Sequence, residues 1–261
     1  MDLDLSGKHA LVCGGSAGIG RATAHELALL GASVTVSSRS VDALQTVVSA
    51  LPTGTGQRHG WIVADAGKTD ALREQVKALV DDRPVQILVN NSGGPPGGAA
   101  HAAQLADFLD AFNQHLIANQ VMVQAVLPAM RAAGWGRIVN VISTSVKEPI
   151  AGLGVSNTVR GAVASWAKTL SRELAGEGIT VNNVLPGYTE TGRIEQIVNS
   201  RVRNTGQSPE DIRAAMRADV PAGRFATPAE TGGVIAFLCS PAAAYINGVS
   251  LAVDGGRMHS I

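Results

Sequence analysis

Short hydrophobic runs, bounded by glycine or polar residues, alternate along the chain with longer segments whose hydrophobic positions recur at helical spacing. The short runs predict seven strands, at 9–13, 33–37, 61–64, 86–89, 137–142, 179–184 and 249–253. Their near-continuous hydrophobic character is typical of parallel strands covered on both faces. The longer segments predict helices at about 19–30, 41–50, 69–82, 103–133, 153–176 and 228–239. This alternation predicts an α/β fold with a doubly wound (Rossmann) seven-stranded parallel sheet and helices on both faces.

The segment 192–224 interrupts this alternation. It is a long connection between the strand at 179–184 and the helix at 228–239. Within it, Ser208-Pro209-Glu210-Asp211 is typical of a capped helix start. Because long connections in compact domains tend to be functional, we expect 192–224 to be a lid or substrate segment of one domain that spans 1–261.

Composition limits the classes of function. The 261 residues are 45% hydrophobic, enough for one substantial core, and Lys+Arg and Asp+Glu are balanced at 21 each. A formal net charge of zero does not indicate binding to nucleic acid or to an anionic membrane. No signal peptide or transmembrane run is present, so we expect a cytoplasmic protein that does not associate with membranes. Cys13 and Cys239 have neither disulfide nor metal-ligand spacing, and no metal site is expected.

The first chemical motif is Gly14-Gly15-Ser16-Ala17-Gly18-Ile19-Gly20, between the first predicted strand and helix. Glycines there let the backbone turn tightly and approach a pyrophosphate, which the amides at the helix start can bind. A tight strand-to-helix turn without a ligand is the alternative. The spacing Gly-x-x-x-Gly-x-Gly differs from the common dinucleotide fingerprint and resembles the loop of the short-chain dehydrogenase/reductase family.

Further motifs extend this resemblance over nearly the whole chain. They are Asp65-Ala66, Asn90-Asn91-Ser92-Gly93, Ser143, Pro186-Gly187 with Thr191, and Val253-Asp254-Gly255-Gly256, each following a predicted strand. The chain is most similar to an atypical branch of β-ketoacyl-carrier-protein-reductase-like members, on Gly93-Gly94-Pro95-Pro96 and Ser156-Asn157. The resemblance implies a nicotinamide cofactor, a small carbonyl or alcohol substrate and a homotetramer. It also implies a set of cofactor-binding residues: Gly14, Ser16, Gly18, Ile19, Gly20, Ser38, Arg39, Asp65, Ala66, Asn91, Gly93, Pro186, Gly187 and Thr191.

Cofactor choice is indicated by Ser37-Ser38-Arg39-Ser40, at the end of the second predicted strand. An acidic residue near Ser38 would favour NAD, because it accepts hydrogen bonds from the ribose hydroxyls and repels a 2′-phosphate. Arg39 instead offers a charged, planar fork suited to phosphate. We therefore expect NADP, with NAD possible; a solvated arginine at a helix start is the alternative.

The proton-transfer residues depart from the family's pattern. The resemblance implies an asparagine, a serine, a tyrosine and a lysine at the positions of His115, Ser143, Ser156 and Arg160. Only Ser143 matches. A serine hydroxyl is a weaker acid than a phenol and reaches less far, while arginine stays protonated and binds anions or ribose. His115 and Tyr188 are candidate substitute acids, each with a structural role as the alternative, and Lys147 and Glu148 are candidates at the rim of the pocket.

The sequence thus predicts an NADP(H)-dependent oxidoreductase that resembles 3-oxoacyl-carrier-protein reductases and has an atypical Ser/Arg site. Loss of a positioned acid typically removes about 10²–10⁴ in rate, so slow chemistry is expected. A catalytically weak or inactive nucleotide-binding (regulatory) protein on the same fold is the alternative.

Overall fold

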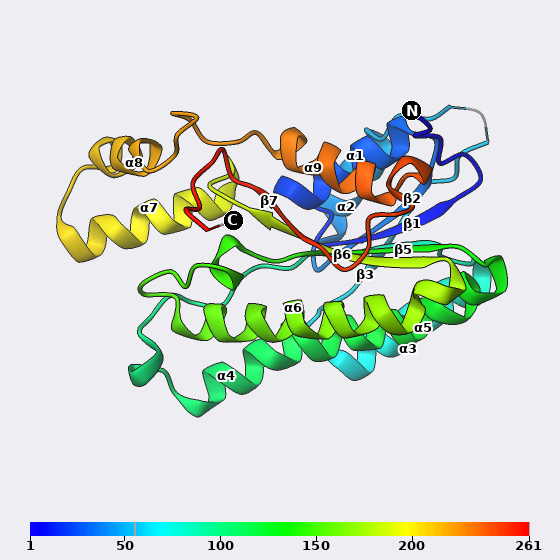
Figure 1. Cartoon of the computed structure of the whole chain (residues 1–261), viewed down its shortest axis with the longest axis horizontal. Helices are drawn as coiled ribbons and strands as arrows, with labels where there is room; N and C mark the ends of the chain where they lie inside the picture. The colour runs from blue at the N-terminus through cyan, green and yellow to red at the C-terminus, as the bar shows by residue number, and fades with distance from the viewer. Residues whose placement is uncertain (55, 261) are drawn as a thin grey trace.

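Seven parallel strands form one sheet through the middle of the computed structural model, which describes residues 1–54 and 56–260 (Figure 1). The strands are β1 (His9–Cys13), β2 (Ser33–Ser38), β3 (Gly60–Val63), β4 (Ile87–Asn90), β5 (Gly136–Val141), β6 (Ile179–Pro186) and β7 (Ser250–Val253). Their order across the sheet is β3-β2-β1-β4-β5-β6-β7. From β1 to β3 the strands are added on one side of the sheet, and from β4 to β7 on the other. This order confirms the predicted doubly wound fold, in which a ligand crevice lies between β1 and β4.

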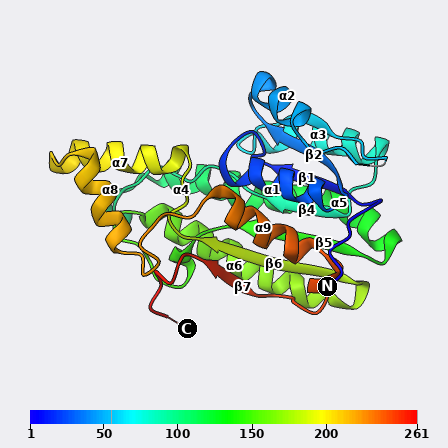
Figure 2. The ribbon, with the colours of Figure 1, turned by 90° about the horizontal axis from the view of Figure 1, so that it is seen from above.

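Helices cover both faces of the sheet (Figures 1 and 2). One face carries α1 (Gly18–Leu29), α2 (Val41–Ser49) and α9 (Pro228–Cys239); the other carries α3 (Thr69–Asp82), α5 (Ala118–Ala133) and α6 (Gly154–Leu174). Each face has its own buried hydrophobic cluster, with Leu27 and Val36 in one and Val126 and Ile138 in the other. None of the helices in the described part of the chain is long and apolar enough to cross a membrane.

The prediction of one uniform helix at about 103–133 was wrong in one respect. The structure has α4 (Leu105–Phe112), a π-helical turn at Asn113–Ile117, and α5. A π turn inserts an extra residue into the helical register and thereby changes which side chain faces inward. His115 lies in this turn and is only 3% exposed.

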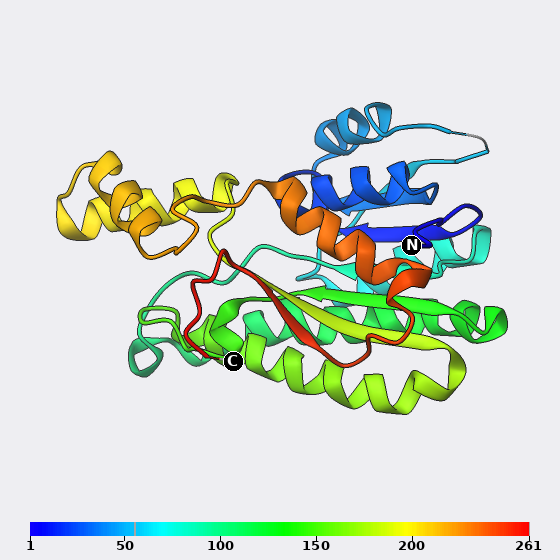
Figure 3. The same cartoon turned by 45° about the horizontal axis from the view of Figure 1, so that its top comes forward.

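The segment 192–224 is mostly helical. It contains α7 (Gly192–Thr205), which the sequence analysis did not identify, and α8 (Pro209–Ala218). The expected start of the second helix is confirmed, because the Ser208 side chain caps it by accepting a hydrogen bond from Asp211 N at 3.1 Å. Both helices project beyond the carboxyl ends of the strands (Figure 3).

A row of hydrogen-bonded side chains crosses four neighbouring strands of the sheet. Asn90, Asn140, Asn183 and Ser250 are register partners on β4 to β7 and are joined in sequence by hydrogen bonds of 2.9, 3.0 and 3.1 Å. A one-residue slip of any of these strands would leave buried amides without partners, which is costly. The row therefore fixes the register of the strands that end at the candidate site.

Candidate nucleotide and substrate site

Only glycine fits at Gly14, in the turn between β1 and α1, and at Gly20, in the first turn of α1. A Cβ atom on Gly14 would lie 2.7 Å from Asn91 O, and one on Gly20 would collide with Gly14 O. The Asn91 amide donates to Cys13 O at 3.2 Å and Gly14 O at 3.3 Å, which ties the residue after β4 to this turn. Asn91 thus has an observed structural role beside the cofactor role expected for it.

The N-terminus of α1 is open to an anion. Its N-cap residue, Ala17, provides no capping side chain, and no acidic residue lies in the first turn. Free N–H groups and the positive end of the helix dipole favour a phosphate there. Thr191 is adjacent, since a Cβ on Gly18 would lie 3.0 Å from Thr191 Cγ2. The structure thereby brings together the turn and the segment after β6.

A cavity of about 410 Å³ opens beside this turn. Its lining includes seven of the expected cofactor residues: Gly14, Ser16, Ser38, Arg39, Asp65, Ala66 and Asn91. The other seven lie outside the lining: Gly18, Ile19, Gly20, Gly93, Pro186, Gly187 and Thr191. Arg39 is exposed, and no carboxylate in the described residues forms an ion pair with it.

Arg160 connects α6 to the end of β5. Its guanidinium Nη1 donates to Val141 O and Ile142 O, both at 3.1 Å, directly before Ser143. Burial, and next the charge of Arg193, lower the pKa of Arg160 to about 10, so the group is still cationic at neutral pH. Ser143 Oγ accepts a hydrogen bond from Ser145 N at 3.1 Å and keeps its own proton available to donate.

Ser156 lies one helical turn before Arg160 and on the same face of α6. It is 7% exposed. Within the described part of the chain, its hydroxyl forms no hydrogen bond. Nothing around it therefore acts as a base or a proton relay in this structure.

His115 is paired with Ser92. Its Nδ1 lies 2.9 Å from Ser92 Oγ, while its buried Nε2 has no partner among the described residues. Burial, and next the charge of Arg160, lower the pKa of His115 to about 3. The imidazole is therefore neutral near pH 7, where it can donate or accept a hydrogen bond but holds no extra proton to transfer.

The other candidate acids are occupied by structural contacts. The Tyr188 ring packs edge-on against Phe225, with centroids 5.9 Å apart, and Arg257 lies over it at 4.5 Å. Glu148 accepts a hydrogen bond from His259 N at 2.7 Å and so holds the C-terminal segment. The packing of the Tyr188 ring fits the structural alternative given for that residue.

The sequence and the fold are similar to those of several reductases. The family model described as enoyl-(acyl carrier protein) reductase matches residues 14–258, and a 3-oxoacyl-(acyl-carrier-protein) reductase of Vibrio cholerae is 33% identical over 97% of this chain and 98% of its own. The chain belongs to the short-chain dehydrogenase/reductase family. It is also similar to an NADPH-dependent reductase of Bacillus subtilis, at 28% identity over 98% of this chain and 100% of that protein. L-sorbose reductase from Gluconobacter frateurii, solved with NADPH and L-sorbose, superposes with a TM-score of 0.93 at 27% identity and full coverage of both chains.

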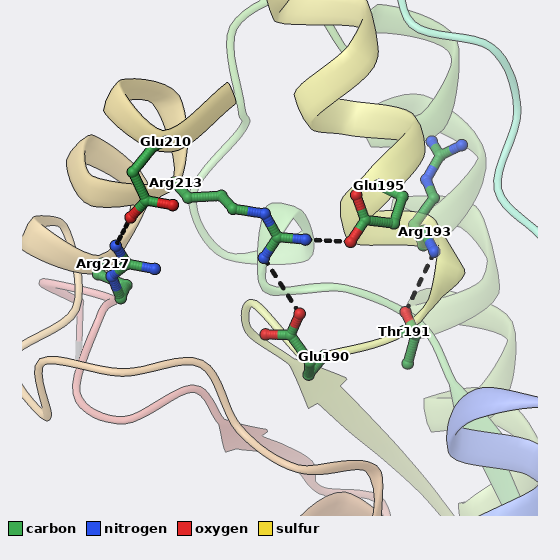
Figure 4. Close-up of polar contacts among 7 residues, drawn as sticks. All are labelled: Glu190, Thr191, Arg193, Glu195, Glu210, Arg213 and Arg217. Carbon is green, nitrogen blue, oxygen red and sulfur yellow. Dashed lines mark hydrogen bonds and ion pairs between the residues drawn. The ribbon is translucent and has the colours of Figure 1, made fainter. Parts of the chain in front are cut away.

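One residue of this short-chain dehydrogenase/reductase was missed by the sequence analysis. It is Arg193, at the start of α7 (Figure 4). Its Nη2 reaches Pro95 O at 3.2 Å, and its charge contributes to the lowered pKa of Arg160. The segment 192–224 contains several arginines, and no periodicity distinguishes this one. Its position two residues after Thr191 was the only available signal.

Proposed function

We propose that this protein is an NADP(H)-dependent oxidoreductase that interconverts a small carbonyl compound and its alcohol. The observation that carries the proposal is the nucleotide side of the site. The uncapped N-terminus of α1 and the cavity lined by Arg39 provide two separate places for anionic groups. The reductases to which the chain is similar support the same reaction class.

The preference for NADP over NAD is assigned to Arg39. Ser38 Oγ accepts from Ser40 N at 3.3 Å, so the Ser38 proton is free to join Arg39 in binding a 2′-phosphate. Arg39 has no acidic partner in the described residues that a phosphate would have to displace. NAD remains a weaker second cofactor in this proposal.

The substrate side is proposed to be an atypical Ser/Arg site. When bound, the nicotinamide supplies the hydride. Ser143 donates a hydrogen bond to the substrate oxygen, and Arg160 provides positive charge at the end of β5. Ser156 stands where the family resemblance places a tyrosine and is a weak acid, so proton delivery is the slow part of turnover.

The second candidate is a nucleotide-binding regulatory protein. The observation that favours it is the lack of a suitable acid: Ser156 has no base as partner in the described residues, and the pKa of His115 is held at about 3. In either case we propose that 192–224 acts as a lid over the site and that the protein forms a homotetramer, as the family resemblance implies.

The test is to titrate the purified protein with NADPH and then to follow NADPH oxidation with ketones, diketones and quinones. Binding with slow turnover of at least one substrate supports the oxidoreductase. Binding with no turnover of any class favours the regulatory protein. Failure to bind NADPH would overturn both.

A further inference from the structure

Two guanidinium groups from different helices meet over Gly94. Arg160 comes from α6 and Arg193 from α7, and a Cβ atom on Gly94 would lie 3.5 Å from the Nη2 atom of each. These two nitrogens are therefore at most twice that distance, 7.0 Å, apart. Because Gly94 has no side chain, the space between them is not filled by the loop that follows β4.

No carboxylate neutralises this pair. Within the described residues, neither arginine forms an ion pair; the Arg193 guanidinium donates only to Pro95 O and Gln196 Oε1, both at 3.2 Å. Two acidic residues close to it in sequence, Glu190 and Glu195, are both bound by Arg213 of α8 (Figure 4). In the same view the Arg193 guanidinium points away from Glu195.

This arrangement is electrostatically incomplete. Arg160 is only 8% exposed, and its Nη2 makes no hydrogen bond with the described residues. Buried charges in proteins are normally paired, because desolvation of an unpaired ion is costly. Two cations facing one gap increase that cost, whereas an anion bound between them would offset it.

We infer that Arg160 and Arg193 bind a carboxylate of the substrate, so that the substrate class is small oxo acids and their hydroxy acids. The inference rests on the proposed function, because it names the substrate of that same site. A planar carboxylate offers two acceptor oxygens, which suits two guanidinium groups that converge on one gap. Phosphates of the cofactor are the other anions at hand, but the start of α1 and Arg39 already provide separate places for them.

The experiment compares acids with their neutral esters. Acetoacetate and levulinate, each beside its methyl ester, are titrated into the protein saturated with NADPH, and binding is followed by NADPH fluorescence or calorimetry. We expect at least one acid to bind about ten-fold or more tightly than its ester, from the usual strength of charge-assisted hydrogen bonds. Steady-state rates with the same four compounds give the second readout.

Variants locate the effect. Arg193→Gln should bring acid and ester to within about three-fold of one another while leaving NADPH affinity within about two-fold, because only a substrate contact is lost. Arg193→Lys keeps the charge and should retain part of the preference. Arg201→Gln is the matched control: Arg201 is exposed on the same helix, roughly 12 Å further along at 1.5 Å per residue, and should behave as wild type.

Three results would overturn the inference: equal binding of acid and ester in the wild type, no measurable binding of either acid, or loss of NADPH affinity in Arg193→Gln as large as the loss for the acid. The last result would assign Arg193 to the cofactor's phosphates. Reduction of the neutral esters without a preference for acids removes this inference and leaves the proposed function standing. Preferential binding of an acid without any turnover would support the carboxylate site and would count against the proposed oxidoreductase.

Discussion

Ser92 and His115 form a partly buried hydrogen bond of 2.9 Å between Oγ and Nδ1, across 23 positions of sequence. The hydroxyl that the loop after β4 supplies is therefore the partner that the imidazole of the π turn needs. Ser92 and His115 form one local unit, and protonation of the His115 imidazole has consequences for stability.

The first prediction concerns acid stability. The pKa of His115 is about 3 in the folded protein and about 6.5 when unfolded. Between these values the unfolded chain binds a proton that the folded chain does not, so the free energy of unfolding falls as the pH is lowered through this window. Each such histidine contributes at most about 1.4 kcal/mol per pH unit, and His9, whose pKa is lowered to about 4 mainly by burial, adds to the effect.

Denaturant unfolding at several pH values checks this contribution. The stability of His115→Asn relative to wild type should improve as the pH falls from about 6.5 to 4.5, by roughly 1 kcal/mol per unit. His101→Asn, on an exposed turn, is the control and should track wild type. A constant difference between His115→Asn and wild type across this range would show that His115 titrates alike in both states.

The second prediction concerns the cofactor. NADPH should bind more tightly than NADH, and Arg39→Ala should weaken NADPH by about 1.5–3 kcal/mol, the usual worth of a hydrogen bond to a charged group. NADH affinity should change little, since it lacks the 2′-phosphate. Calorimetry with both cofactors measures this, and equal affinities in the wild type would refute the assignment of Arg39.

The third prediction concerns the helices α7 and α8. Arg213 of α8 lies 3.1 Å from Glu190 and also pairs with Glu195, and so joins α8 to the start of α7. If 192–224 is a lid, NADPH or substrate should slow hydrogen exchange in it. Arg213→Gln should speed that exchange a few-fold, because exposed ion pairs contribute about 0.2–1 kcal/mol each.

Arg217→Gln is the control for this experiment, since Arg217 pairs with Glu210 inside α8 and not across the two helices. Strong protection of 192–224 that is the same with and without NADPH would rule out a mobile lid.

The fourth prediction separates binding from chemistry. Ser156→Tyr with Arg160→Lys should leave NADPH affinity within a few-fold and raise turnover of an accepted ketone by roughly ten-fold or more, given the usual size of the acid–base contribution. Addition of His115→Asn tests whether the π turn limits the gain. Wild-type turnover at an ordinary rate of about 1–10³ s⁻¹, abolished by Tyr188→Phe or His115→Ala, would contradict it.

The sequence by itself determined the strands, most of the helices and the glycine-rich turn. These depend on local patterns: hydrophobic runs of strand length, helical periodicity, and glycines such as Gly14 and Gly20 whose neighbours leave no room for a side chain. The order of motifs after each strand then indicated a nucleotide crevice, because the carboxyl ends of parallel strands meet at one edge.

Only the tertiary structure decided the chemistry of the substrate side. The inward position of His115 follows from a π turn that periodicity cannot reveal, and its pairing with Ser92 joins segments from two elements. In the sequence, Arg193 is one of several arginines in 192–224; only its place at the start of α7 shows that its guanidinium lies near Arg160. Such contacts, and the burial that lowers the pKa of His115 and Arg160, depend on how distant segments pack, and no local pattern contains that information.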